Sequence, residues 1–185
     1  SSYAPIRAAL MSPHFLFRIE RDPAHGIAEI NEYELATRLS YFLWSSMPDD
    51  ELFDLARRGQ LRAGQAGQVA RMLKDPKARA LTDNFAEQWL KLRALGNITP
   101  DPALFPEFTD ELRAAMLGET KRFFAGIVDE DRSVMELLQA DYTWLNETLA
   151  RHYGIAGVVG DQFQRVELDP ASLRGGLMTQ ASILT

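Results

Sequence analysis

A chain of 185 residues, with 46% hydrophobic and 25% charged side chains, is long enough to bury a core without disulfides or metal ions to hold it together. Its formal net charge of −6 and the lack of a basic stripe disfavour nucleic acid as a partner, because the phosphate backbone is itself anionic. The sequence contains no cysteine, which excludes disulfides, thiolate metal ligands and covalent attachment of haem c within this chain.

The first half of the sequence carries the signals of several short helices. The pattern predicts a helix over 4–20 that is interrupted at Ser12-Pro13, because proline removes a backbone donor. Asn31 and Glu34 have the spacing of a capping box ahead of a helix over 32–45. Further helices are expected from Pro48 to Gly59, over 65–74 and, after Asp75-Pro76, over 77–92.

The second half begins after a loop that contains three prolines, residues 96–109. We expect this loop to be ordered and anchored by Leu104, Phe105 and Phe108. Thr109 then caps the longest predicted helix, 110–130. The remaining expected elements are a helix over 134–140, a helix from Asn146 to Tyr153 closed by Gly154, and a strand-like alternation over 163–168 without an obvious partner.

These elements predict an all-α fold, an irregular bundle of about eight or nine short helices with at most one short strand pair near the C-terminus. The proline-rich loop separates an N-terminal helical half, 1–95, from a C-terminal helical half, 110–185, and we expect the two to form one compact unit. The chain begins at Ser1 without a methionine and ends within an apolar stretch. We therefore interpret it as part of a longer protein.

The stretch RLSYFLW, residues 38–44, could fill a core, line a ligand cage or contact a membrane. At 100° per residue its leucines share one stripe, and Tyr33, Ser40 and Trp44 extend the apolar surface around the helix. A membrane-surface helix favours flanking lysines, whereas acidic residues follow this one. The pattern therefore predicts a helix at the centre of the core.

The helix predicted over 110–130 carries a carboxylate, Glu119, inside its apolar stripe of Leu112, Met116, Phe123 and Ile127. An uncompensated buried charge costs several kcal/mol, so Glu119 must be paired, hydrogen-bonded or neutral. One hypothesis is a catalytic general acid/base or metal ligand with a raised pKa. The other is a structural ion pair, for which Arg38 is one candidate partner, and the two residues together are the candidate catalytic pair.

The histidines are His14, His25 and His152, and their spacing fits no metal site. No metal ion is therefore predicted. His152 lies in the last turn of its predicted helix, where a cation interacts favourably with the helix dipole. The alternative role of His152, as an axial haem ligand, makes it the candidate cofactor-binding residue.

Several strings resemble known families. Similarity to a planctomycete-type, cytochrome-associated domain of unknown function, family number 1592, is carried by SPHFLFRIE (12–20), ELATRLSYFLWSSMPDDEL (34–52), VARMLKDPKA (69–78) and NFAEQWL (84–90). Residues 131–155 and 163–185 resemble its usual companion domain, family number 1588. The resemblance provides no catalytic residues.

What the resemblance implies is an exported bacterial polypeptide, periplasmic or extracellular, in which haem c belongs to a fused or partner cytochrome domain. The first functional hypothesis is a helical module that scaffolds or positions a substrate or partner for that cytochrome. The alternatives are the catalytic domain of an oxidoreductase or polymer-degrading enzyme centred on the buried carboxylate, and a purely structural interaction domain. No apolar run approaches the roughly 20 residues that cross a bilayer, so this segment is not expected to insert into a membrane.

Overall fold

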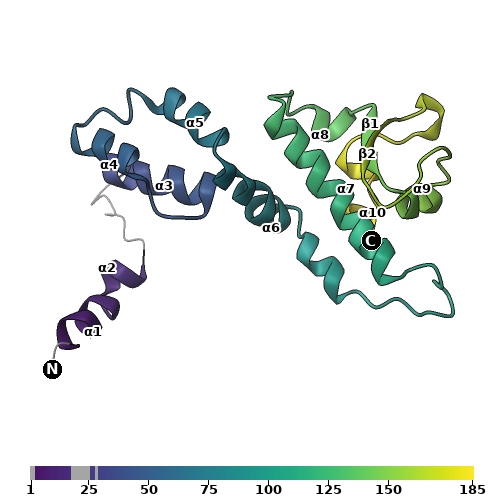
Figure 1. Cartoon of the computed structure of the whole chain (residues 1–185), viewed down its shortest axis with the longest axis horizontal. Helices are drawn as coiled ribbons and strands as arrows, with labels where there is room; N and C mark the ends of the chain where they lie inside the picture. The colour runs from purple at the N-terminus through teal and green to yellow at the C-terminus, as the bar shows by residue number, and fades with distance from the viewer. Residues whose placement is uncertain (1–2, 18–25, 28) are drawn as a thin grey trace.

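The computed structural model describes residues 3–17, 26–27 and 29–185. Over these ranges the protein contains ten α-helices and one antiparallel pair of short strands, which confirms the predicted fold class. Figure 1 shows α3, α4 and α5 grouped at one end and α7 with α8, α9 and the strand pair grouped at the other.

In chain order, the elements fall into two parts. Those of the first part are α1 (Ala4–Leu10), α2 (Pro13–Leu16), α3 (Glu32–Trp44), α4 (Asp50–Arg57), α5 (Gln65–Leu73), the 3₁₀-helix η1 (Pro76–Ala78), the π-helix η2 (Leu81–Ala86), α6 (Glu87–Trp89) and the 3₁₀-helix η3 (Leu92–Asn97). Those of the second part are α7 (Asp110–Asp129), α8 (Glu136–Gln139), β1 (Tyr142–Leu145), α9 (Glu147–Tyr153), β2 (Gln164–Glu167), the 3₁₀-helices η4 (Pro170–Ser172) and η5 (Leu177–Thr179), and α10 (Ala181–Leu184).

Two predicted helix caps are present, at Asn31 and Thr109, whereas the helix predicted over 134–140 is shortened to Glu136–Gln139 and has no side-chain cap. The Asn31 side chain accepts a hydrogen bond from the Glu34 backbone, and the Glu34 side chain accepts one from the Asn31 backbone, so the capping box at α3 is confirmed. Asp49 and Thr109 cap α4 and α7 through the backbone N–H of Leu52 and Leu112. The helix break at Ser12-Pro13, between α1 and α2, also follows the prediction. The part of that predicted helix beyond residue 17 lies outside the described residues.

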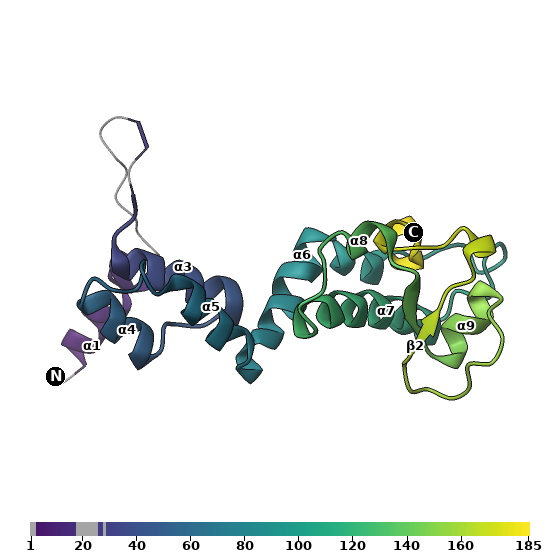
Figure 2. The same ribbon diagram turned by 90° about the horizontal axis from the view of Figure 1, so that it is seen from above.

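Helix α3 is amphipathic and is not enclosed by the core on all sides. One face carries buried Leu35, Leu43 and Trp44, and the Trp44 indole donates a hydrogen bond to the Met72 carbonyl at 2.9 Å. The prediction of a helix apolar and buried around most of its circumference is wrong, because Phe42 is 51% exposed on the other face. The neighbouring elements cover α3 only in part. Helices α4, α5 and η2 pack against it, Figure 2 shows α4 and α5 beside it, and the Phe42 side remains half exposed.

The single regular helix predicted over 77–92 is also wrong. A 3₁₀ turn, the π-helix η2 and the short helix α6 occupy this stretch instead. Leu81 and Ala86 are both buried, yet residues five apart lie about 140° apart around an α-helix of 3.6 residues per turn. The i→i+5 bonds of a π-helix bring both residues to the core side of the segment.

The proline-rich loop runs without regular structure from Ile98 to Thr109. Its predicted anchors are corrected, because Leu104 is 72% and Phe105 is 59% exposed. Phe108 does pack against the core. The Arg113 guanidinium lies 5.2 Å from the Phe108 ring centre and donates a hydrogen bond to the Ile98 carbonyl, which ties this end of the loop to α7.

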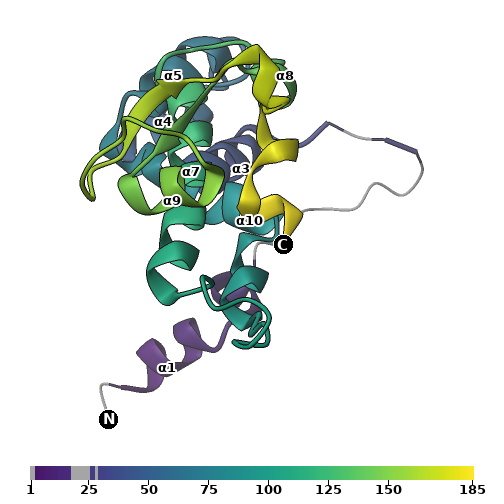
Figure 3. The ribbon, with the colours of Figure 1, turned by 90° about the vertical axis from the view of Figure 1, so that its right-hand side faces the viewer.

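Helix α7 is the central element of the fold. Its four predicted stripe residues are all buried. Different faces of α7 contribute to three core clusters: Phe124 packs with the α3–α5 helices, Met116 packs with α9, and Phe123 packs with β1. Figure 3 shows α9 and α10 in front of α7 in the end-on view.

The strand-like alternation at 163–168 has its partner in β1. The two strands pair antiparallel, with Tyr142 opposite Glu167 and Leu145 opposite Gln164. The sequence did not reveal β1, because its four residues lie between two predicted helices and are too few for a clear alternation.

Gly118 on α7 is expected not to tolerate alanine. An added Cβ would lie 2.5 Å from Cζ of Phe163, a partly buried ring that packs against the core. Overpacking of about 1–3 kcal/mol outweighs the better helix propensity of alanine, about 1 kcal/mol. Urea unfolding of Gly118→Ala should show a loss of stability. The matched Gly67→Ala change on α5 meets nothing within 4 Å and should stabilise the protein; equal effects of the two variants would contradict this packing account.

Candidate functional site

Glu119 lies at the centre of a buried hydrogen-bond network. It is 1% exposed. The Thr143 hydroxyl of β1 donates to Oε1 of Glu119 at 2.6 Å, and the Tyr153 hydroxyl of α9 donates to Oε2 at 2.6 Å. Of the three predicted alternatives for this carboxyl group, an ion pair, hydrogen bonds or a neutral state, the structure shows the hydrogen bonds.

The same network fastens the C-terminal segment, residues 168–185, to α7. The Ala181 backbone N–H donates to the Tyr153 hydroxyl at 2.8 Å. The neighbouring Thr120 hydroxyl donates to Oε1 of Gln180 at 2.7 Å. Glu119 and Thr120 thus hold α9 and the start of α10 against α7 through side chains that are themselves buried or partly buried.

Burial raises the pKa of Glu119 to about 7, and the hydrogen bonds from Thr143 and Tyr153, with the Arg174 charge, only partly oppose this rise. The pKa of Tyr153 is also raised, by its burial and by the adjacent Glu119. The Arg174 guanidinium carbon lies 3.7 Å from the centre of the Tyr153 ring. A carboxyl group that titrates near neutrality could transfer protons.

The space beside Glu119 is nevertheless small. The cavity is lined by Glu119, Thr143, Tyr153 and residues of the C-terminal segment, and it offers only about 10 Å³ to the centre of a water molecule. This space is enough for about one water molecule. No substrate fits next to Glu119 in this conformation.

The predicted pairing of Glu119 with Arg38 is wrong. Arg38 is exposed on α3, where it lines a surface groove with Tyr41 and Phe42, and the charge that acts on Glu119 is that of Arg174. Sequence spacing could not reveal this, because Arg174 is remote in the chain and reaches Glu119 only through the fold of the C-terminal segment. A catalytic role for either Glu119 or Arg38 remains a prediction.

His152 lies exposed at the end of α9, as expected for a helix-terminal histidine. Its ring centre is 5.6 Å from that of Tyr153. Haem ligation by His152 remains a prediction. His25 and the side chain of His14 lie outside what is described, and within the described ranges no group of three or more His, Cys, Asp or Glu side chains is placed to hold a metal ion.

A groove on the surface between α3 and the η2–α6 segment has an unusual lining, and we refer to it as the aromatic groove. Its volume is about 660 Å³, and it is lined by Arg38, Tyr41, Phe42, Ser45, Asn84, Phe85 and Gln88. Aromatic and hydrogen-bonding side chains make up this whole set. Among the residues that the structure describes, no aliphatic side chain and no carboxylate contributes to it.

The aromatic side chains of this groove belong to a longer row. The Phe42 and Phe85 rings meet edge to face at 5.2 Å, and Phe85 stacks on Trp89 at 5.8 Å with 17° between the ring planes. Phe124 of α7 continues the row into the core at 6.4 Å from Phe85. Phe42 is 51% and Trp89 is 52% exposed, so the outer part of the row faces solvent.

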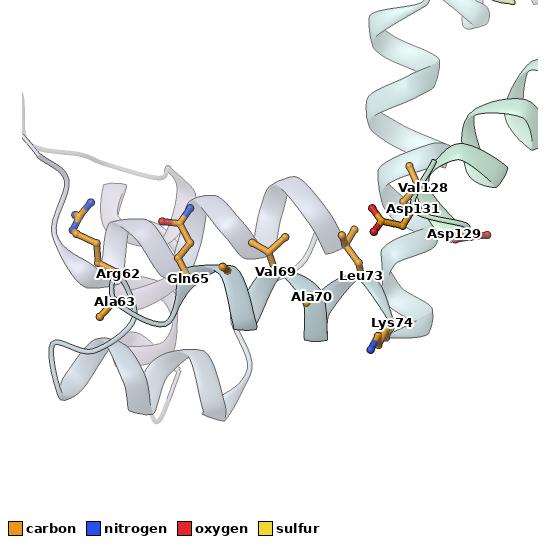
Figure 4. Close-up of a pocket in the computed structure, with 11 residues that line it drawn as sticks. Arg62, Ala63, Gln65, Val69, Ala70, Leu73, Lys74, Val128, Asp129 and Asp131 are labelled. Carbon is orange, nitrogen blue, oxygen red and sulfur yellow. The ribbon is translucent and has the colours of Figure 1, made fainter. Parts of the chain in front are cut away.

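A second groove lies between α5 and the C-terminal end of α7, with a volume of about 930 Å³ (Figure 4). Its wall from α5 is aliphatic, with Val69, Ala70 and Leu73, and Val128 faces it from α7. Polar residues lie toward both ends of it: Lys74, Asp129 and Asp131 at one end, and Arg62 and Gln65 toward the other (Figure 4).

Sequence reasoning missed both grooves. For the aromatic groove the available signal was the string NFAEQWL, in which an amide precedes an aromatic residue twice at a spacing of four, Asn84-Phe85 and Gln88-Trp89. A spacing of four places such pairs on one face of a helical segment. The opposite wall contains Phe42, which the helical pattern of the sequence predicts to be in the core.

The fold and these sites define a mostly helical domain with a closed buried carboxyl group and an open aromatic groove. Over residues 30–155 the sequence matches the profile of the family described as PSD4: Protein of unknown function (DUF1592). The chain belongs to this family. No curated protein and no solved structure matches the chain.

None of the helices in the described part of the chain combines the length and the apolar character needed to cross a bilayer.

Proposed function

We propose that this chain is a helical module of an exported, haem-associated polypeptide and that it positions a substrate or partner for a c-type cytochrome domain. The aromatic groove is the binding surface of this module. One observation carries the proposal: the ring of Phe42 is half exposed in a groove of about 660 Å³, whereas Glu119 is sealed beside a cavity of about 10 Å³.

The shape and lining of the aromatic groove support this assignment. Ligand sites have volumes of about 300–1,000 Å³ and combine apolar or aromatic walls with a few placed polar groups. The groove lies within that range. Two of its polar groups hold each other in place, because the Asn84 amide donates a hydrogen bond to the Ser45 hydroxyl at 2.9 Å.

The haem context rests on the resemblance to a cytochrome-associated family and on family membership. Because the chain has no cysteine, covalent haem c must be attached to another domain or to a partner. The same resemblance is the basis for proposing the companion domain, family number 1588, in the C-terminal residues. It is also the basis for proposing an extracytoplasmic location.

An enzymatic role centred on Glu119 is the second candidate, and the pKa of about 7 of this buried carboxyl group favours it. A substrate would reach Glu119 only after the segment that contains Arg174, Gly176 and Gln180 moves aside, since these residues line the cavity. The open groove needs no such movement, and the binding role is therefore preferred.

The haem association is tested with the complete product of the gene that encodes this chain, expressed in a bacterial host that attaches haem c. We expect the protein in the periplasmic or secreted fraction, with a Soret band that persists after denaturation or a stable complex with a haem protein. A product that stays in the cytoplasm, or an exported product without haem and without a haem-protein partner, would contradict the proposal.

A further inference from the structure

We infer that the aromatic groove binds a neutral saccharide chain. This inference rests on the proposed function, for which it names the class of substrate.

The rings of the groove offer the apolar part of sugar recognition. One face of a pyranose ring consists of C–H groups, which carry a small positive charge and match the negative face of an aromatic ring. Phe42 is 51% and Phe85 is 37% exposed, although both have aromatic neighbours. The edge-to-face contact between them holds the two rings at an angle of 69°, so the groove presents a fixed aromatic corner.

The side chains between the rings offer the polar part. Sugar hydroxyl groups both donate and accept hydrogen bonds, and side-chain amides do the same. Asn84 uses one of its donors on Ser45, which orients the amide plane and leaves it a second donor and an acceptor. Gln88 is exposed one helical turn further along the same wall, so hydrogen-bonding groups recur along the groove.

The segment that carries these groups has an uncommon winding. Asn84 and Phe85 belong to the π-helix Leu81–Ala86, and Gln88 follows in α6. π-Helical turns are rare in proteins, and those that occur are often found at functional sites. The buried Leu81 and Ala86 fix this turn to the core, so the Asn84 and Phe85 side chains emerge from a well-supported stretch of backbone.

The lining also distinguishes a saccharide from other ligands. A helical peptide would be expected to dock on aliphatic side chains, as offered by the groove between α5 and α7, and the described lining of the aromatic groove has none. A nucleotide or single-stranded nucleic acid could stack on the same rings. The net charge of −6 of the whole chain opposes the approach of a phosphate chain, and Arg38 is the one charged side chain in the described lining of the groove.

Calorimetric titration of the 185-residue chain with cellohexaose, xylohexaose and chitohexaose tests the inference. We expect at least one of them to bind. Phe42→Ala and Gln88→Ala should each weaken that binding about tenfold, because the first removes an aromatic ring that contacts the sugar and the second removes a hydrogen-bonding amide. The matched controls, Phe105→Ala in the proline-rich loop and Gln162→Ala before β2, are exposed elsewhere and should leave the affinity unchanged.

Two results would overturn the inference. One is that none of the three oligosaccharides binds at millimolar concentration to a chain whose circular dichroism shows it folded. The other is that binding occurs but is weakened equally by the groove variants and the control variants. Neither result bears on haem association or export, which are measured on the complete gene product, so a failure here is distinguishable from a failure of the proposed function.

Discussion

Replacement of Glu119 by glutamine is expected to remove a pH dependence of stability of about 3 kcal/mol. Burial raises the pKa of Glu119 from 4.5 to about 7, and each tenfold change in proton affinity between the folded and unfolded states is worth about 1.4 kcal/mol. Because the folded state binds the proton more tightly, the contribution of Glu119 is full below about pH 4.5. It is lost as the pH rises through about 7.

Glutamine has the size of glutamic acid and carries no charge at any pH, so it lacks this dependence. Between pH 4.5 and pH 8, wild type should therefore lose about 3 kcal/mol of unfolding free energy relative to Glu119→Gln. Urea unfolding of the two proteins at both pH values measures the difference directly. Stability curves that run parallel over this range would show that Glu119 is not protonated near neutrality in the folded protein.

Asp49 provides a control of opposite sign. Its burial tends to raise its pKa, but the hydrogen bonds from Arg71 and the Leu52 backbone outweigh that effect and leave the pKa below its usual value. The stability that Asp49 contributes is therefore present above its unfolded pKa and is lost as the pH falls. Asp49→Asn should therefore run parallel to wild type between pH 4.5 and pH 8, and below the unfolded pKa of 3.8 it should diverge in the direction opposite to Glu119→Gln.

Alanine at Gly176 is expected to cost about 3 kcal/mol or more and to loosen the C-terminal segment. Gly176 has φ 63° and ψ −174°, a backbone conformation essentially reserved for glycine and worth about 1–3 kcal/mol of strain in other residues. An added Cβ would also lie 2.6 Å from the Leu137 carbonyl oxygen and 2.7 Å from that of Leu138. These are backbone atoms within α8, which cannot turn aside as a side chain can.

A substitution at Gly157 separates the backbone strain from the contact with α8. Gly157 also has a positive φ of 89°, but a Cβ added there would have no neighbour within 4 Å, so Gly157→Ala should cost only the strain, about 1–2 kcal/mol. Thermal unfolding should show a clearly larger loss for Gly176→Ala. Limited proteolysis should then cut that variant first near Leu177, which is buried in wild type. Similar losses for both variants would mean that α8 yields to the added methyl group.

Local chemistry within the sequence determined much of the helical framework. The caps at Asn31, Asp49 and Thr109 depend on side chains that reach only three residues along the chain, so spacing alone predicts them. The stripe of α7 is equally local, because the helical period fixes which residues share a face. The burial of Glu119 followed from this period, and so did its need for hydrogen-bond partners.

Only the tertiary structure decided which groups meet. Thr143 and Tyr153 reach Glu119 from 24 and 34 residues away, and β1 finds β2 across α9. The aromatic groove exists because α3 and a π-helical turn approach each other with Phe42 and Phe85 outward. The exposure of Phe42 could not be derived from its helix, since periodicity defines a face but not which neighbour covers it. Contacts across the chain depend on the packing of whole elements, and no local spacing encodes that packing.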